Sequence, residues 1–156
     1  SDVYKRQMLY TGTSRLGGEI AGKVIANLGD KASEIRQLRE MVKTGAEILL
    51  GSASLDAFGE LLHEAWMIKR EMAEGIANSD IDGIYKTALA HGALGGKLLG
   101  AGSKGFMLFY VPSEKQQAVT QALSRYLWVP VTFDREGSTT IYYDIPQEPP
   151  FSSISK

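Results

Sequence analysis

The sequence contains no cysteine among its 156 residues. This absence excludes disulfides, thiolate zinc sites and cysteine nucleophiles together. An excess of charge of one sign is lacking as well, because 17 Lys and Arg face 18 Asp and Glu, for a formal net charge of −1. A chain without a strongly basic field gives no sign of nucleic acid or an anionic membrane as a partner.

Long apolar runs are also missing. No stretch approaches the about 20 apolar residues that span a bilayer, and no signal-peptide pattern of basic head, apolar middle and small cleavage residues occurs. We therefore expect a cytoplasmic location and no membrane partner. Hydrophobic residues make up 44% of the chain and charged residues 22%, which is typical of a soluble globular domain large enough to bury a core.

The two ends of the chain differ from the part between them. Residues 1–7 (SDVYKRQ) are polar and aperiodic, and we interpret them as a non-native or mis-joined head that lies outside the fold. Residues 145–156 contain three prolines and few apolar residues, which predicts a flexible tail. The foldable domain is then 8–144, although ordinary native termini remain an alternative for both ends.

Apolar residues recur at helical spacing through the first half of the chain. The pattern predicts four helices: one capped by Ser14 and ending near Gly29, one over 31–50, one capped by Ser54 and stopped by Gly75, and one over 80–90 ended by Gly92. We expect Trp66 to pack beside the apolar stripe of the third helix, rather than to form a platform for a sugar ring.

The period changes to that of strands in the second half. Short strands are predicted at 8–11, 97–99 and 106–111, with a helix beginning at Pro112. The segments 128–133 and 139–143 alternate apolar and polar residues around a short turn, and we expect them to pair as an antiparallel hairpin. These elements predict an α+β fold, a two-layer sandwich of helices on a small, mainly antiparallel sheet.

A glycine-rich stretch, GGKLLGAGSKGF at 95–106, separates two of the predicted strands. Glycine permits positive φ and a close approach of the backbone to another surface. Consecutive backbone N–H groups form a cradle for phosphate oxygens, and Lys97 or Lys104 can add positive charge. A hairpin loop in which glycine only permits close packing explains the same residues, and composition alone favours that second interpretation.

Two familiar nucleotide motifs do not match this stretch. The Gly-x-x-x-x-Gly-Lys-Ser/Thr spacing is absent, and a strand rather than a long helix follows the glycines. A dinucleotide fingerprint is excluded too, because no strand, turn and helix with a later acidic residue surrounds them.

Several charged or aromatic residues have two interpretations. Arg15, after a predicted strand, either binds an anionic sugar phosphate in bidentate fashion or is a helix-start arginine in water. His63 and Glu64 lie off the apolar stripe, which favours a polar helix face over a catalytic pair. We expect Asp80 and Asp82 to favour a helix start rather than to bind metal.

Two more predictions concern helix ends. His91, beside the helix-ending Gly92, is expected to interact with the helix terminus. The run Lys69-Arg70-Glu71 is expected to be a solvated face.

The run Gly95 to Gly102, continuing into Gly105-Phe106 and an apolar strand, resembles the third conserved motif of the GHMP kinases. Three further blocks, at 9–15, 61–66 and 75–82, together with 93–111, are similar to the carboxyl-terminal halves of the D-glycero-D-manno-heptose 7-phosphate kinases in that family. The resemblance covers roughly residues 8–144. It implies the ferredoxin-like α+β carboxyl-terminal domain of an ATP-dependent sugar kinase that phosphorylates an anomeric hydroxyl.

The resemblance also implies roles for particular residues. The nucleotide and phosphate loop would consist of Lys97, Gly100, Ala101, Gly102, Ser103, Lys104 and Gly105. Ser14 and Arg15 would contact the sugar-phosphate substrate. ATP and Mg²⁺ would act through the full-length enzyme. The main phosphate loop and the catalytic acid would belong to a missing amino-terminal kinase domain, the partner of this chain, so no catalytic residue and no metal ligand is assigned here.

One departure from the family pattern is Ser103-Lys104, where the family has further glycine, and we expect Lys104 to point to solvent. We expect a bulky residue at Gly102 to cut activity with little loss of folding. The chain alone should be inactive. Another GHMP kinase with a different small-molecule acceptor and a stand-alone, non-catalytic binding module remain alternatives.

Overall fold

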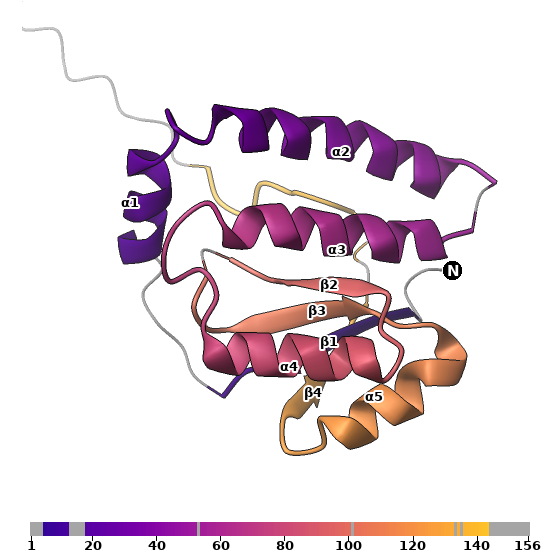
Figure 1. The fold of residues 1–156 in the computed structure, drawn as a ribbon. Helices are drawn as coiled ribbons and strands as arrows, with labels where there is room; N and C mark the ends of the chain where they lie inside the picture. Colours follow the sequence, from indigo (N-terminus) through magenta and orange to yellow (C-terminus); the bar gives the residue numbers. More distant parts are fainter. Residues whose placement is uncertain are drawn as a thin grey trace, which may run out of the picture.

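The computed structural model describes residues 5–12, 18–52, 54–100, 102–132, 134 and 136–143. Its elements follow one another as shown in Figure 1: β1 (Arg6–Tyr10), α1 (Gly18–Ala26), α2 (Ala32–Leu50), α3 (Asp56–Arg70), α4 (Ser79–Ala90), β2 (Gly95–Leu98), β3 (Phe106–Tyr110), the short 3-10 helix η2 (Ser113–Lys115), α5 (Gln116–Ala122) and β4 (Leu127–Val129). The helices predicted over 31–50 and 80–90 are therefore confirmed to within a residue. The Ser14 cap lies outside the described residues.

The four strands form one antiparallel sheet in the order β2-β3-β1-β4. Leu9 and Leu98 both stand opposite Met107 in the register, so these three side chains share one face of the sheet. The strand order and the two helices that connect into β2 and β4 correspond to the ferredoxin-like arrangement. The predicted α+β sandwich is confirmed.

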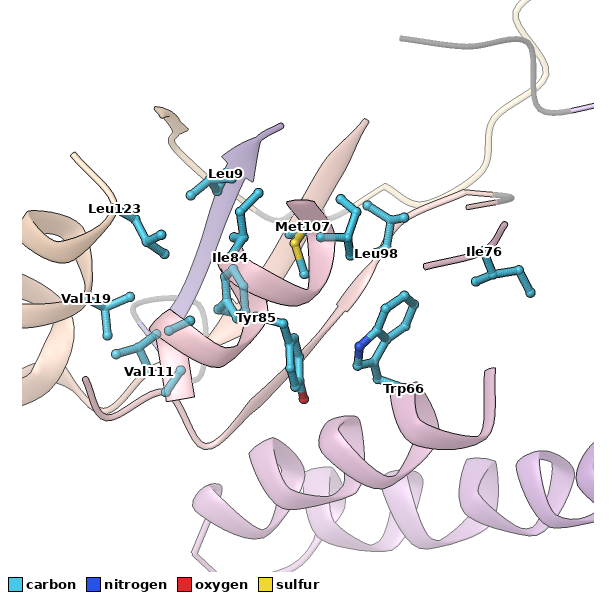
Figure 2. Packing of buried hydrophobic residues seen from close by; sticks show 14 of the residues in the cluster. Leu9, Trp66, Ile76, Ile84, Tyr85, Leu98, Met107, Val111, Val119 and Leu123 are labelled. Atoms are coloured by element: carbon cyan, nitrogen blue, oxygen red, sulfur yellow. The ribbon is translucent and has the colours of Figure 1, made fainter. Parts of the chain in front are cut away.

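One hydrophobic core fills the space between this face of the sheet and the helices. Leu9, Leu98 and Met107 are fully buried there, together with side chains from α4 and α5 (Figure 2). Trp66 of α3 is also fully buried and lies beside Tyr85 of α4, with ring centroids 6.1 Å apart. The prediction that Trp66 is a packing residue is thus confirmed, and the core ties α3 to α4 and the sheet.

Glycines on α3 and on β2 bring the helix and the strands close together. A Cβ at Gly59 of α3 would lie 2.8 Å from both Leu94 Cβ and Tyr110 Cδ1. A Cβ at Gly95 of β2 would collide with the carbonyl oxygen of Gly59, and one at Gly96 would lie 2.6 Å from Phe109 Cδ1. The packing interpretation of the glycine-rich stretch therefore holds for its first two glycines.

The exclusion of residues 5–7 from the fold is wrong. Strand β1 begins at Arg6, because Arg6 and Gln7 pair with Tyr110 and Phe109 of β3. Lys5 is held as well, since its carbonyl oxygen accepts a hydrogen bond from Val111 N at 2.7 Å. Ladder hydrogen bonds to a central strand compensate for the polar character of these residues.

The predicted hairpin of 128–133 with 139–143 is also wrong. Strand β4 spans Leu127–Val129 and pairs with β1, and Pro130 follows it with no N–H to continue a ladder. No strand occurs among residues 136–143, where Ile141 is 96% exposed. The alternating pattern at 128–133 did indicate a strand, but the partner of that strand is β1 and not a segment across a local turn.

No helix in the described part of the chain has the length and apolarity to cross a bilayer.

Candidate functional site

The glycine loop, residues 99–105, joins β2 to β3 at the end of the sheet nearest α1 (Figure 1). The structure describes all of it except Ala101. Left-handed backbone dominates the loop: φ is +75° at Gly100, +131° at Gly102, +69° at Ser103 and +117° at Gly105. Ser103 is the one non-glycine residue with positive φ in the described part of the chain, and such a conformation persists only where neighbouring contacts hold it.

Side chains from outside the loop bind carbonyl oxygens of the loop and of the end of β2. Lys69 Nζ, from the end of α3, donates to Gly100 O at 2.7 Å and to Leu98 O at 3.2 Å. Asn78 Nδ2 donates to Ser103 O at 2.8 Å. Gly100 O and Ser103 O are thus occupied by side-chain donors from the end of α3 and the start of α4.

Thr11, directly after β1, closes the far end of the loop. Its N–H and its Oγ1 hydroxyl both donate to Gly105 O, at 2.8 and 2.9 Å, and Oγ1 accepts from Gly105 N at 3.0 Å. Within the loop, Lys104 N donates to Gly102 O at 2.9 Å.

The loop N–H groups divide into two sets. The first set is bound within the molecule: Ser103 N donates to Ile76 O at 2.8 Å, and the amides of Lys104 and Gly105 donate to Gly102 O and Thr11 Oγ1. The N–H groups of Gly100 and Gly102, by contrast, have no hydrogen-bond partner among the described residues. Two backbone donors without a hydrogen-bond partner in the described part of the chain suit an incoming anion.

The three loop glycines differ in the room around them. A Cβ at Gly102 would lie 2.8 Å from Ile76 Cα, whereas nothing lies within 4 Å of a Cβ at Gly100 or Gly105. Gly102 is thus required for packing against the segment before α4. This geometry leads us to expect that a bulky residue at Gly102 impairs folding as well as activity, contrary to the expectation from the sequence.

The lysine that touches the loop differs from the two predicted ones. Lys104 is exposed, as expected. Lys97 is half-buried and lines the groove between α2 and α3 with Phe58 and Leu61. Lys69 was predicted to be solvated, and that prediction is wrong because its side chain reaches from the end of α3 to Gly100 O in the loop and to Leu98 O at the end of β2.

The Lys69 side chain lies in apolar surroundings. It lines, with Gly100, a pocket of about 260 Å³ whose other walls come from α1 and the segment after α3: Ala21, Val24, Ile25, Met72 and Ile76. Burial lowers the pKa of Lys69, and the nearby charge of Lys97 lowers it further. A cation is therefore held at the glycine loop at some cost in solvation.

Asn78 connects the loop to α4. Its Oδ1 accepts a hydrogen bond from Ile81 N at 3.0 Å as the N-cap of that helix, while its Nδ2 holds Ser103. Asp82 in the first turn pairs with Arg70 of α3 at 2.6 Å. The helix-start role expected of Asp82 is compatible with this pair, but Arg70 belongs to the run that was expected to be solvated, and that expectation is wrong for Arg70 too.

The two histidines have structural contacts. His63 Nδ1 and Tyr85 OH share a hydrogen bond of 2.8 Å that links α3 to α4, whereas Glu64 is exposed. The two residues do not form a pair, in agreement with the interpretation that they are not a catalytic pair. His91 Nδ1 lies 2.8 Å from Thr87 O at the end of α4, which confirms its expected position.

Sequence reasoning missed Lys69, Asn78 and Thr11, which hold the loop. An asparagine before Ser79-Asp80 is itself a helix-cap signal, although nothing in the sequence pairs it with Ser103. Ser14, Arg15 and Ala101 lie outside the described residues, so their roles stay predictions. No group of three or more His, Asp or Glu able to hold a metal ion occurs within the described ranges.

Comparison with known proteins places this site in a family. The family model described as GHMP kinases C terminal matches residues 46–127, which include α3, α4, the glycine loop and α5. D-glycero-alpha-D-manno-heptose 7-phosphate kinase of Campylobacter jejuni is 30% identical over 129 residues, covering 80% of this chain and 38% of that protein. The bifunctional fucokinase/GDP-fucose pyrophosphorylase of Arabidopsis thaliana is 28% identical over 124 residues, covering 76% of this chain and 12% of that protein.

Solved structures show the same fold. Mevalonate kinase of Methanococcus jannaschii matches with a TM-score of 0.67 at 18% identity, over 80% of this chain and 38% of that one. L. major mevalonate kinase in complex with R-mevalonate matches with a TM-score of 0.64 at 21% identity, over 77% and 38%. The chain thus spans less than two fifths of the length of each of these relatives.

Proposed function

Since the chain belongs to the GHMP kinases and matches their C-terminal domain, we propose that it is the carboxyl-terminal part of an ATP-dependent sugar kinase that phosphorylates the anomeric hydroxyl of a sugar phosphate. The match of the family model over the glycine loop and the helices that hold it carries this proposal. The relatives are kinases that are longer than this chain, which supports a preceding amino-terminal domain as its partner.

The acceptor is D-glycero-D-manno-heptose 7-phosphate. The similarity to the heptose 7-phosphate kinase of Campylobacter jejuni extends over 129 residues, which are 80% of the chain. Ser14 and Arg15, after β1, would bind the phosphate of that acceptor, for which a guanidinium is well suited because it donates in bidentate fashion. Fucose is the second candidate acceptor, favoured by the similarity to the Arabidopsis fucokinase.

The glycine loop would bind phosphate oxygens with backbone amides. Phosphoryl transfer is catalysed mainly by positioning and charge stabilisation, so such donors matter without acid–base chemistry. Gly100 and Gly102 supply the N–H groups, and Ala101 lies between them. Ser103 and Gly105 shape the loop, because their amides are bound within the fold.

Lys97 would flank this loop and Lys104 would lie within it, and the bound nucleotide would supply the transferred γ-phosphoryl group. Mg²⁺ would be held by the nucleotide and by the preceding domain, since the described residues contain no cluster of metal ligands. The catalytic acid belongs to that domain as well. Residues 1–156 alone are therefore inactive, and the complete kinase works in the cytoplasm.

The test uses the complete protein that contains this chain. It is incubated with ATP, Mg²⁺ and heptose 7-phosphate, with ADP release followed in a coupled assay and the new anomeric phosphate by phosphorus NMR. L-Fucose and mevalonate serve as competing acceptors. We expect kcat/KM for the heptose phosphate to exceed the others by at least about tenfold.

Three outcomes would contradict parts of the proposal. A preference for fucose would remove the heptose assignment and keep the kinase. No ATP-dependent transfer to any acceptor, with tight binding of another ligand by residues 1–156, would favour a non-catalytic binding module. Turnover by residues 1–156 alone would contradict the assignment of catalysis to the preceding domain.

A further inference from the structure

We propose that Lys69 is a positioning residue of the glycine loop, and that its ammonium group binds the carbonyl oxygens of Leu98 and Gly100 so that the loop amides face a bound phosphate. This inference rests on the proposed function, since it deepens the role of the same loop. In this inference the lysine that acts on the loop is Lys69, from the end of α3. Lys97 and Lys104, the lysines of the glycine motif itself, do not have this role.

The first argument is the direction of the carbonyl groups. A carbonyl oxygen facing a phosphate oxygen would repel it, so a loop that binds phosphate has to turn its carbonyls elsewhere. Lys69 Nζ takes two of them, at 2.7 Å from Gly100 O and 3.2 Å from Leu98 O. The N–H group of Leu99, the residue between Leu98 and Gly100, donates to Phe106 O at 2.8 Å and forms the last backbone hydrogen bond between the two strand ends.

The second argument is the location of the charge. The Lys69 ammonium borders a pocket that is otherwise apolar, with Met72 and Ile76 in its walls. No carboxylate in the described ranges lies within ion-pair distance of Lys69. A partly desolvated cation bound by carbonyl dipoles leaves net positive charge at Gly100, and that charge favours an anion at this part of the loop.

The third argument is that the alternatives make no such contact. The side chains of Lys97 and Lys104 donate no hydrogen bond to a loop atom within the described part of the chain. Lys97 lies in the α2–α3 groove, and Lys104 is exposed.

The experiment compares Lys69→Met, which keeps the length and removes the donors, with Lys69→Arg, which restores them. Lys86→Met, on the exposed side of α4, is the matched control. In the complete kinase, amide hydrogen exchange at residues 99–105 and the dissociation constant of a non-hydrolysable ATP analogue are measured for each variant. We expect Lys69→Met to raise both the exchange rate of the loop amides and the dissociation constant of the analogue by at least about tenfold. Lys69→Arg should bring both values most of the way back, and Lys86→Met should match the wild type.

A mutation-free measurement covers the case in which Lys69→Met does not fold. Scalar couplings through the hydrogen bonds, from the labelled Lys69 Nζ to the carbonyl carbons of Leu98 and Gly100, report the two contacts directly in the wild-type protein. We expect both couplings. Their absence, or unchanged loop exchange and analogue affinity in a folded Lys69→Met variant, would overturn the inference.

Failure of the proposed function has a different signature. If the complete protein transfers no phosphoryl group but Lys69→Met still raises loop exchange and Arg restores it, the positioning role stands and the kinase assignment fails. If turnover is normal and Lys69→Met changes neither exchange nor analogue affinity, the kinase assignment stands and the role of Lys69 fails.

Discussion

Gly100 and Gly102 stand two residues apart with positive φ, yet their surroundings make them different at the scale of single residues. Gly100 faces open space, whereas a Cβ on Gly102 would lie 2.8 Å from Ile76 Cα and 3.2 Å from Ile76 O. Backbone atoms cannot move aside as a flexible side chain can. Gly100 is thus favoured only by its backbone conformation, whereas at Gly102 the lack of space for a Cβ is a second requirement.

Substituting each glycine by alanine tests this difference. We expect Gly100→Ala to cost about 1 kcal/mol of unfolding free energy, since alanine only has to adopt the left-handed region. Gly102→Ala should cost about 3 kcal/mol or more, because strain and backbone overlap add. Urea denaturation measures both, and equal losses would show that Ile76 can give way.

Lys5 and Asp56 connect the start of β1 to the start of α3. Lys5 Nζ donates to Asp56 Oδ1 at 2.8 Å, and Tyr110 OH donates to the same oxygen at 3.4 Å. The hydrogen bond from Lys5 lowers the pKa of Asp56 below its ordinary 3.8. A carboxyl whose folded pKa is depressed stabilises the fold above its unfolded pKa, and that contribution is lost as the pH falls through the folded value.

Acid unfolding therefore depends on this carboxyl. We expect the melting temperature of Asp56→Asn to lie below that of the wild type at neutral pH, and the difference to shrink as the pH falls below about 4. Glu64→Gln, exposed on the same helix, is the control and should follow the wild type. A constant difference from neutral to strongly acidic pH would contradict the contribution of the Lys5 pair.

At the scale of elements, α4 and the glycine loop share one residue. Asn78 caps α4 through Oδ1 and holds Ser103 O through Nδ2. The helix start and a residue with positive φ are thus stabilised by the two ends of one amide group. Changing that amide separates the two contributions.

Asn78→Asp keeps the cap and removes the donor to Ser103, whereas Asn78→Ala removes both. We expect Asn78→Ala to lose about 1–2 kcal/mol of stability and Asn78→Asp to lose less, because aspartate is a good cap near a helix dipole. Hydrogen exchange at Ser103 and Lys104 should rise in both variants. If Asn78→Asp left that exchange unchanged, the amide would not hold the loop.

At the scale of the whole molecule, α2 packs on the outer side of α3 (Figure 1). Apolar side chains of α2 remain in contact with water. Val42 is 72% exposed and Leu50 is 89% exposed, and the groove between the two helices is lined largely by apolar side chains. An exposed apolar face of this kind promotes association.

We expect residues 1–156 to associate as their concentration rises, and Val42→Lys with Leu50→Lys to reduce this association. Sedimentation velocity over a range of concentrations measures it. Lys86→Glu, an exposed charge change on α4, controls for altered charge. A wild-type chain that stays monomeric at every concentration would show that the α2 face does not drive self-association.

The sequence by itself determined the helices α2, α3 and α4 and the strands around the glycine loop, because helical and strand periodicities are local properties of neighbouring residues. Only the tertiary structure decided which side chains hold the loop. Lys69, Asn78 and Thr11 reach it across 31, 25 and 94 residues of sequence. It also paired β4 with β1 and assigned Gly95 to packing against Gly59. Contacts between distant residues depend on how the elements are stacked, and no local pattern encodes that stacking.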